Sequence, residues 1–279
     1  MIAFDFKFHS PKTVKEAVEL YRMTKSQGLV PRYFSGGTEF ISRARRNEID
    51  VDVVINIKDI KECQSLKLSE DTLTIGVANT LTTLIDCNIF PLLTEVARSI
   101  ATKTAQNKIT IGGNIMSYLP YKEALLPFLI SDSDVVIAGE DGFKQINIHD
   151  LFSNGFKMKD GECLIQLITP KKAIESPFYH KKSARQSRIN YPLVTTTSLF
   201  VENEVRIAVS GIGKEPIRNK EVERIAKETS SNLTTKVTQM VEPFSKQAID
   251  NAEASAAYRT FILEGMLENI LKKREELNA

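Results

Sequence analysis

Two glycine pairs constrain the fold of this chain more than any other feature of its 279 residues. Gly36-Gly37 lies within residues 35–40, and Gly112-Gly113 lies within residues 110–115. Glycine tolerates a positive φ and lets a ligand or another part of the chain approach closely. Successive backbone N–H groups in such a turn form a concave anion site. Either pair alone is also the composition of an ordinary tight turn, but two such turns in one domain suit a ligand with two linked phosphates.

The surroundings of the first pair predict a helix N-terminus. Residues 32–35 read as a short strand and residues 39–46 as a helix with one apolar side. The free N–H groups and the dipole of a helix N-terminus favour an anion. Neither pair has the spacing G-x-G-x-x-G or G-x-x-x-x-G-K-[ST], so the usual dinucleotide fold and the P-loop are both excluded.

The hydrophobic pattern predicts a mixed α+β chain with two domains. Expected strands cover residues 51–57, 66–68, 73–76, 135–137, 164–168, 194–201 and 204–211, with hairpins across 69–71 and 202–203. Expected helices cover residues 10–21, 81–85, 91–102, 125–130, 220–228 and 252–276. The last helix is the strongest, and its predicted apolar face holds Ala254, Ala257, Tyr258, Phe261 and Ile262. The polar stretch 171–177 ends in proline and predicts a boundary between domains 1–175 and 176–279.

The amino-acid composition limits the kinds of partner and the cellular compartment that are expected for this protein. The 37 Lys+Arg against 35 Asp+Glu give a net charge of +2, which offers no electrostatic argument for nucleic acid or an anionic membrane. No apolar run approaches the ~20 residues of a membrane span, and the N-terminus lacks a signal-peptide pattern. Cys63, Cys87 and Cys163 are too scattered for zinc or iron–sulfur ligation, so no metal is expected. Isolated cysteines favour a reducing compartment, and the sequence therefore predicts a cytoplasmic protein.

Catalytic residues are not indicated. His9, His149 and His180 are isolated from one another in sequence, and each is better explained as a structural or surface residue. There is no G-x-S-x-G and no evident triad, so hydrolysis has no support.

The two glycine segments, in this order and spacing, resemble the flavin subunit of the molybdenum hydroxylases, the family of the xanthine dehydrogenase and carbon monoxide dehydrogenase medium chains. That family has A-G-G-T-[DE]-[LF] near its start and T-I-G-G-N-[IL] near position 110, followed by a proline and an acidic residue. Here the proline is Pro120 and the acidic residue is Glu123. Residues 54–57, 73–77, 178–182 and 257–259 also fall where the family has comparable segments, so the resemblance spans nearly the whole chain.

The resemblance implies a fold, a cofactor and a set of ligand residues. The fold is a two-part FAD-binding domain of the vanillyl-alcohol-oxidase/PCMH type, followed by a small α+β C-terminal domain of strands packed on helices. The cofactor is FAD. The matching positions are Ser35, Gly36, Gly37, Thr38, Glu39 and Phe40 in the first loop and Thr110, Gly112, Gly113 and Asn114 in the second. Glu123 would accept from ribityl or ribose hydroxyls, and Lys182 would lie near the isoalloxazine, a place for which Lys181 competes.

The implied activity is electron transfer within a complex. In the resembling enzymes a molybdopterin subunit oxidises the substrate, and a [2Fe–2S] subunit passes electrons to FAD, which delivers them to NAD or another acceptor. This chain offers no cluster ligands and no molybdopterin-sized domain, so both partners would be other chains. Among substrates of the complex, xanthine-type purines are preferred on family frequency, with carbon monoxide, nicotinate-like heterocycles and aldehydes open.

Two alternatives stay open. The stretch 106–109 replaces the family's Arg-Asn, and Tyr118-Leu119 is bulkier than the family's small residues. These departures motivate a nucleotide-binding scaffold or assembly protein without electron transfer. A stand-alone flavin oxidoreductase is the other alternative, against which the small C-terminal domain argues.

Overall fold

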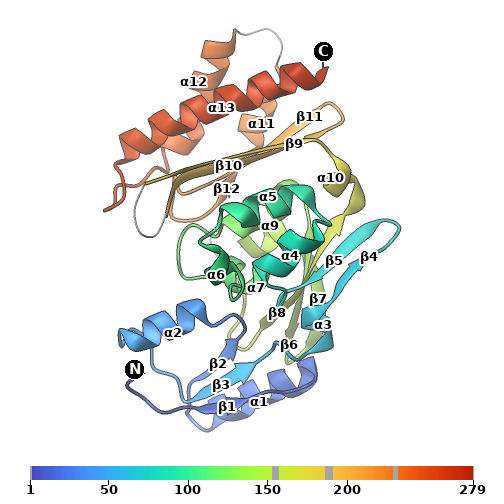
Figure 1. The fold of residues 1–279 in the computed structure, drawn as a ribbon, viewed down its shortest axis with the longest axis vertical. Coiled ribbons are helices and arrows are strands. Elements are labelled where there is room, and N and C mark those ends of the chain that lie inside the picture. Colours follow the sequence, from blue (N-terminus) through green and yellow to red (C-terminus); the bar gives the residue numbers. More distant parts are fainter. Residues whose placement is uncertain (1, 153–156, 186–190, 229–231, 279) are drawn as a thin grey trace. The chain divides into compact units, whose positions relative to one another are not determined.

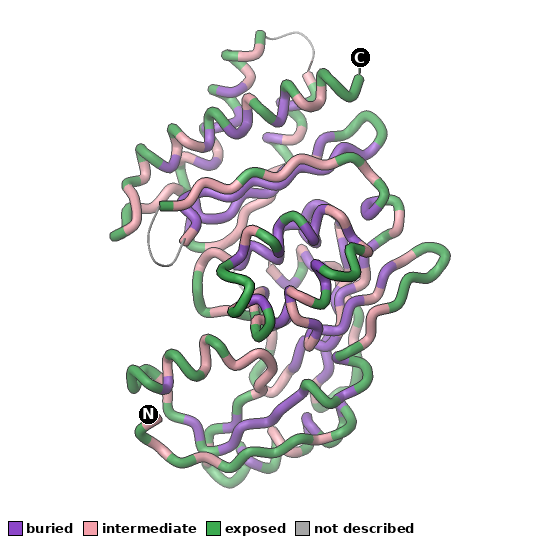
Figure 2. Tube along the Cα trace, in the orientation of Figure 1, coloured by how far each residue is buried: buried purple, intermediate pink, exposed green. Residues whose placement is uncertain are grey.

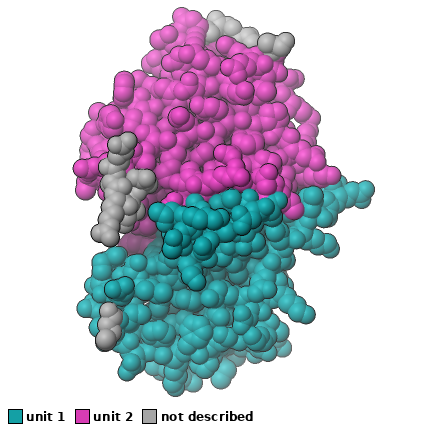
Figure 3. Space-filling view, in the orientation of Figure 1, with its two compact units in different colours: residues 1–87, 102–117, 132–170 teal, residues 88–101, 118–131, 171–279 magenta. Residues whose placement is uncertain are grey.

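The computed structural model describes residues 2–152, 157–185, 191–228 and 232–278. These residues form two compact units, drawn in two colours in Figure 3. Unit 1 takes Met1–Cys87, Thr102–Ser117 and Asp132–Pro170, and unit 2 takes Asn88–Ala101, Tyr118–Ser131 and Lys171–Ala279. The last segment of unit 2 begins close to the predicted boundary at residue 175. The chain nevertheless enters unit 2 twice before that point, so the division into domains 1–175 and 176–279 stays a prediction.

Unit 1 begins with a small parallel sheet. Strand β3 (Val53–Asn56) lies between β1 (Lys7–His9) and β2 (Pro31–Phe34), as Figure 1 shows. Helix α1 (Val14–Ser26) starts with a capping box, in which Thr13 accepts from the Glu16 N–H and Glu16 accepts from the Thr13 N–H. Helix α2 (Thr38–Arg45) follows β2 after the first glycine pair. The predicted strand and helix on either side of this pair are therefore confirmed.

The second sheet of unit 1 is antiparallel, and its strand order is β4-β5-β8-β6-β7. Its strands are β4 (Leu66–Leu68), β5 (Thr72–Gly76), β6 (Asp134–Gly139), β7 (Gly142–Asn147) and β8 (Cys163–Pro170). The predicted hairpin is present, with Leu66 opposite Ile75 and Leu68 opposite Leu73. The short helices of this unit are α3 (Lys61–Gln64), α4 (Leu81–Cys87), α6 (Lys103–Gln106), α7 (Ile111–Ile115) and α9 (Ile148–Phe152).

Unit 2 is built on one antiparallel sheet in the order β12-β11-β10-β9. The strands are β9 (Phe178–Ala184), β10 (Pro192–Val201), β11 (Glu204–Ser210) and β12 (Ile217–Arg218). All ten residues of β10 are buried, although four successive ones, 195–198, are Thr or Ser (Figure 2). A strand buried on both faces needs cover on each. Successive side chains of a strand point to opposite faces, so each face of β10 buries two of these four polar side chains.

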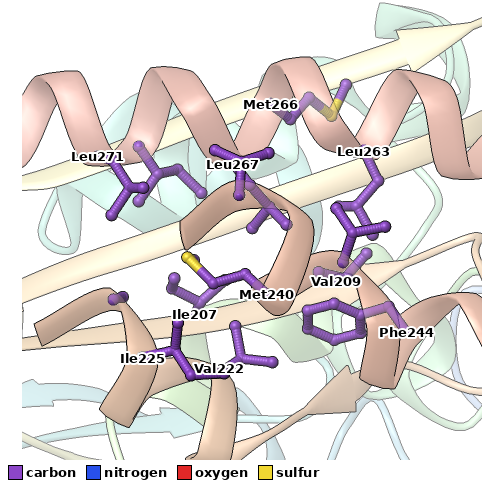
Figure 4. Close-up of a cluster of buried hydrophobic side chains, with 14 of the residues drawn as sticks. Ile207, Val209, Val222, Ile225, Met240, Phe244, Leu263, Met266, Leu267 and Leu271 are labelled. Atoms are coloured by element: carbon purple, nitrogen blue, oxygen red, sulfur yellow. The ribbon is translucent and has the colours of Figure 1, made fainter. Parts of the chain in front are cut away.

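The two faces of this sheet are covered by different parts of the sequence. The first cover comes from α5 (Pro91–Ser99), the short η1 (Glu123–Leu125) and α8 (Leu126–Ile130). The other comes from α11 (Lys220–Lys227), α12 (Leu233–Ser245) and α13 (Ala256–Asn278), while α10 (Lys171–Glu175) precedes β9. Figure 4 shows the apolar core of the second side, where Met240, Phe244, Leu263 and Leu267 meet Ile207.

The buried face of α13 differs from the predicted one. Tyr258 and Phe261 are 51% and 68% exposed, whereas Leu263, Met266, Leu267, Ile270 and Leu271 are buried. The buried residues recur at helical spacing, and Arg259 falls on the same stripe four positions before Leu263. Arg259 is fully buried because its guanidinium donates to the Leu193 carbonyl at 2.5 Å and the Gly211 carbonyl at 2.8 Å.

Several elements were not predicted from the sequence, among them β7, β9 and α12. Strands β7 and β9 have mixed polar patterns, and α12 contains several Thr and Val residues together with Pro243. β-branched residues and proline lower helix propensity, so tertiary packing of Val237, Met240, Val241 and Phe244 supplies the stability of α12. The predicted mixed α+β class is confirmed. Among the described residues, no helix combines the length and the apolar composition that crossing a membrane requires.

Candidate functional site

The first glycine pair joins β2 to α2 and lies against the second glycine segment, both within unit 1. A Cβ added to Gly36 would lie 2.2 Å from the Lys108 carbonyl oxygen and 3.0 Å from the Thr110 nitrogen. Gly37 has φ +73° and precedes the first residue of α2. Both positions therefore require glycine, one for close approach and the other for its left-handed conformation. The structure brings together two loops that are far apart in the sequence.

The first loop presents unused hydrogen-bond donors. Within the described part of the chain, the N–H groups of Gly36, Gly37 and Thr38 have no acceptor. The Ser35 hydroxyl is buried and also has no partner there. Buried polar groups without partners are rare, and unused N–H groups at the start of a helix favour an anion. This loop fits the phosphate part of a nucleotide cofactor.

The second loop differs from the prediction, because its donors are used within the protein. The Ile111 and Gly112 N–H groups donate to the Asn79 and Val77 carbonyls at 2.9 and 3.0 Å. Thr110 precedes α7, and its Oγ1 accepts from the Gly113 N–H at 3.2 Å. The expectation of a second nest of free N–H groups is therefore wrong. The glycine at 112 is required instead because a Cβ there would lie 2.5 Å from that of Val77.

Three other predicted positions of unit 1 have partners within the chain. The Ser117 hydroxyl donates to Glu39 Oε2 at 2.5 Å, which ties α2 to the segment after α7. The Asn114 N–H donates to the Thr110 carbonyl at 2.9 Å. The Phe40 ring makes edge contacts with Phe6 and Phe34, at centroid distances of 5.9 and 5.6 Å. Glu39 and Phe40 fix the start of α2 beside the first loop, whereas the Asn114 contact lies within the second segment.

Glu123 and Lys182 belong to unit 2 and pair with each other. Lys182 Nζ lies 3.0 Å from Glu123 Oε2 and also donates to the Ser99 carbonyl at 2.8 Å. The Thr195 hydroxyl donates to Glu123 Oε1 at 2.8 Å. The two side chains are only 6% and 11% exposed, whereas Lys181 is exposed. Of the two candidate lysines, Lys182 is therefore the one that enters the buried cluster.

Burial dominates the electrostatics of this cluster. It raises the pKa of the Glu123 carboxyl above its ordinary value, while the Lys182 ammonium and the Thr195 hydroxyl act in the opposite direction. His180 lies on the same strand as Lys182, and burial lowers its pKa to about 4. His180 is therefore neutral at physiological pH. It accordingly lacks the charge to compete with Lys182 for the carboxylate.

The sequence did not point to Thr195 or to Lys122. Thr195 is one of several hydroxyl residues in β10, and nothing in its local pattern separates it from its neighbours. Lys122 has φ +36°, is 7% exposed and pairs with Glu215 at 2.6 Å. A left-handed non-glycine residue is an unusual conformation that sequence alone does not reveal. Thr195 binds the Glu123 carboxylate directly, and Lys122 fixes the backbone immediately before Glu123.

The geometry of unit 1 and the family comparison agree. Residues 4–172 match the family described as the FAD binding domain in molybdopterin dehydrogenase. That match covers more than half of the chain, so the chain belongs to this family, and FAD is the cofactor of its domain.

The curated relatives carry names of subunits. The chain is 28% identical over 186 residues to the "Nicotinate dehydrogenase FAD-subunit" of Eubacterium barkeri, a match that covers 64% of this chain and 62% of the relative. It is 23% identical over 228 residues to the "Carbon monoxide dehydrogenase medium chain" of Hydrogenophaga pseudoflava, covering 78% of each. The match to the first relative thus spans less than two thirds of that protein.

Solved structures share the fold over almost the whole chain. One chain of carbon monoxide dehydrogenase from Hydrogenophaga pseudoflava superposes with a TM-score of 0.85 at 20% identity, covering 96% of both chains. One chain of quinoline 2-oxidoreductase from Pseudomonas putida 86 gives a TM-score of 0.83 at 16% identity, covering 98% of both. At these identities the likeness concerns the fold alone. The predicted two-part architecture followed by an α+β domain agrees with it.

Proposed function

We propose that this chain is the FAD-binding electron-transfer subunit of a multi-subunit molybdenum hydroxylase. It takes electrons from a [2Fe–2S] subunit and passes them through FAD to NAD or another acceptor. The observation that supports this best is the set of unused donors from Ser35 to Thr38, in a chain of an FAD-binding family. Bound FAD would supply the exchange between single electrons and electron pairs.

The proposed ligand residues have different tasks. Ser35, Gly36, Gly37 and Thr38 hold the pyrophosphate through N–H and hydroxyl groups, at the N-terminus of α2. Glu39 and Phe40 keep that loop in shape. Thr110, Gly112, Gly113 and Asn114 close the other side, with a smaller share of the phosphate contacts because the backbone donors of Gly112, Gly113 and Asn114 are already used. Glu123 and Lys182 act on the ribityl and isoalloxazine parts, respectively.

The proposed partners are a [2Fe–2S] subunit and a molybdopterin subunit. The names of the relatives, an FAD subunit and a medium chain, support a heteromeric complex. The substrate would bind to another subunit. Xanthine-type purines remain our preferred substrates on the resemblance, with nicotinate-like heterocycles and carbon monoxide as candidates from the relatives' names. The cytoplasm is the proposed compartment, which three unpaired cysteines favour.

The test is the visible spectrum of the purified chain, with FAD added if it is colourless, together with a titration of FAD against the folded protein. Ser35→Ala removes a hydroxyl that has no partner among the described residues, so the stability of the apo chain should not change. FAD affinity should fall about tenfold if Ser35 donates to the phosphates. Ser131→Ala is the matched control, because Ser131 Oγ is also buried and unpartnered but belongs to unit 2.

The outcomes separate the candidates. Absence of FAD binding by the folded wild type would contradict the flavoprotein proposal. Reduction of bound flavin by NADH alone would support NAD as the acceptor. Recovery of the chain from its source without other subunits would favour a stand-alone flavin oxidoreductase.

A second candidate is a nucleotide-binding scaffold or assembly protein without electron transfer. The internally satisfied donors of the second loop favour it, because they leave fewer groups for the cofactor. A chain that binds FAD but whose flavin is not reduced by the electron-donating subunits would support this candidate.

A further inference from the structure

A buried polar cluster lies on one face of the unit 2 sheet. Lys182 of β9 and Thr195 of β10 are directly opposite each other in the antiparallel register, so their side chains point to the same face. Both reach Glu123 of η1, one to each carboxylate oxygen, at 3.0 and 2.8 Å. Thr195 is fully buried and Glu123 is 4% exposed. The carboxylate is therefore held by two side chains from neighbouring strands.

The backbone under Glu123 is fixed as well. Lys122 adopts a left-handed conformation, and its buried ammonium pairs with Glu215 at 2.6 Å. The Ser210 hydroxyl donates to the Tyr121 carbonyl, one residue earlier. Glu123 thus enters the cluster from a segment anchored to Ser210 at the end of β11 and to Glu215 after it. Its carboxylate cannot turn away without breaking the bonds from Lys182 and Thr195.

We propose that Thr195 is a positioning residue for the flavin site. Thr195 acts through Glu123 and thereby sets how much of the Lys182 positive charge is left uncompensated beside the flavin. The inference rests on the proposed function, in which Lys182 lies near the isoalloxazine. The Thr195 hydroxyl favours the ionised carboxylate, because it donates a hydrogen bond that an anion accepts more strongly than a neutral acid. The ionised carboxylate in turn neutralises Lys182. Loss of the hydroxyl shifts the cluster toward protonated Glu123 and an uncompensated ammonium.

Few other charges act on this cluster. Lys182 and Thr195 are the groups that oppose the effect of burial on Glu123. Tyr121, from its own segment, is influenced by the Glu123 charge, and burial raises the pKa of that phenol. His180 of β9 is influenced by Lys182 and by Glu95 of α5, and it is neutral at physiological pH. The charge balance of the cluster is thus set mainly by Glu123 and Lys182.

The structure offers a matched control two residues along β10. Thr197 is as buried as Thr195, its side chain points to the same face, and its hydroxyl has no partner within the described residues. Thr195→Val and Thr197→Val therefore make the same chemical change with and without loss of the bond to Glu123. Thr195→Ser keeps the hydroxyl and should restore the wild-type behaviour.

The experiment uses the full chain and two readouts. The first is the pH dependence of unfolding without FAD. Thr195→Val should lose more stability than Thr197→Val above the folded pKa of Glu123. This excess should disappear as the pH falls and the carboxyl takes up a proton, because the bond serves the ionised form. The apparent pKa of Glu123 should rise by about one unit in Thr195→Val.

The second readout is the midpoint potential of bound flavin. Glu123→Gln should shift it to more positive values and Lys182→Met to more negative values, because they leave opposite net charges beside the reduced flavin. Thr195→Val should follow Glu123→Gln in direction, whereas Thr197→Val should leave the potential unchanged. Shifts of the same sign in Glu123→Gln and Lys182→Met would overturn the proposal, and so would equal pH profiles in the two Thr→Val variants.

The two readouts separate this proposal from the proposed function. A folded wild type that binds no FAD would overturn the flavoprotein function. The pH profile needs no flavin, and it decides independently whether Thr195 acts on Glu123. A wild type that binds FAD, with Thr195→Val indistinguishable from Thr197→Val in both readouts, would overturn the positioning role alone.

Discussion

Gly36 faces the carbonyl oxygen of Lys108 with no room for a side chain, since an added Cβ would lie 2.2 Å from that oxygen. Gly36→Ala should therefore force the first loop away from the second segment and destabilise the chain by about 1–3 kcal/mol, a typical cost of overpacking. Equilibrium urea unfolding measures the effect. The opposing atom belongs to the backbone, so a flexible side chain cannot relieve the clash.

Gly265→Ala is the matched control for this prediction. Gly265 lies inside α13, and a Cβ there has no heavy atom within 4 Å. Alanine in an exposed helix interior should stabilise the chain by about 0.5–1 kcal/mol relative to glycine. If the two Gly→Ala variants were equally stable, the tight approach of Gly36 to the second segment would be contradicted.

The Glu123–Lys182 pair should behave as a buried ion pair in a double-mutant cycle. Lys182→Met leaves an unpaired buried carboxylate and should cost about 3–5 kcal/mol near neutral pH. The double variant Glu123→Gln with Lys182→Met should cost less than the sum of the two single changes. It removes both charges, whereas each single change leaves one unpaired charge buried. Denaturant unfolding of all four proteins gives the coupling energy. Additive costs would indicate that the pair contributes no direct interaction.

Stability should fall in mild acid because of His180. Burial lowers its pKa in the folded chain to about 4, below the ordinary histidine pKa of 6.5, so the unfolded chain binds the proton more readily between these two pH values. The free energy of unfolding should therefore rise with pH across this window, by roughly 3 kcal/mol at most from this group. Thermal unfolding from pH 4 to pH 7 measures the slope. His180→Gln should flatten it, whereas an unchanged slope would show that another group is responsible.

Thiol reactivity should distinguish the three cysteines. Burial raises the pKa of Cys63 to about 12 and also raises that of the buried Cys163, while Cys87 is exposed. Because the thiolate is the nucleophile, only Cys87 should react quickly with a thiol reagent in the native chain. All three should react in denaturant. Cys87→Ser should remove the fast phase, and a fast phase that survives would contradict the burial of the other two.

Local patterns in the sequence were sufficient for much of the fold. The apolar–polar alternation of residues 66–68 and 73–76 predicted the β4–β5 hairpin, and the β-branched run before Ile57 predicted β3. The glycine pairs indicated both loops, because a requirement for glycine is a local backbone property. These elements are determined by residues close to one another in the sequence, and the local pattern is therefore sufficient to predict them.

The missing parts depend on distant neighbours. The pairing of Glu123 with Lys182, and the use of the second loop's donors by Val77 and Asn79, join residues that no local pattern connects. The face of α13 was misassigned because Tyr258 and Phe261 are apolar by type, whereas Arg259 occupies the buried stripe by binding carbonyls. The two carbonyl acceptors of Arg259 reverse the usual preference of a charged residue for the surface.

The path of the chain between the two units has a consequence for how such a protein can be divided. The segments Asn88–Ala101 and Tyr118–Ser131 lie between parts of unit 1 in sequence but fold with unit 2. A fragment cut at residue 172, where the family match ends, would retain α5 and α8 without the strands that they contact, which are β9 for α5 and β10 and β11 for α8. During synthesis of the full chain, these two helices would likewise lack that cover until β9, β10 and β11 leave the ribosome. No single position in the sequence separates the two units, since each unit consists of three segments of the chain. Gene fission or domain shuffling therefore cannot separate them by one break, and the two units must be inherited together.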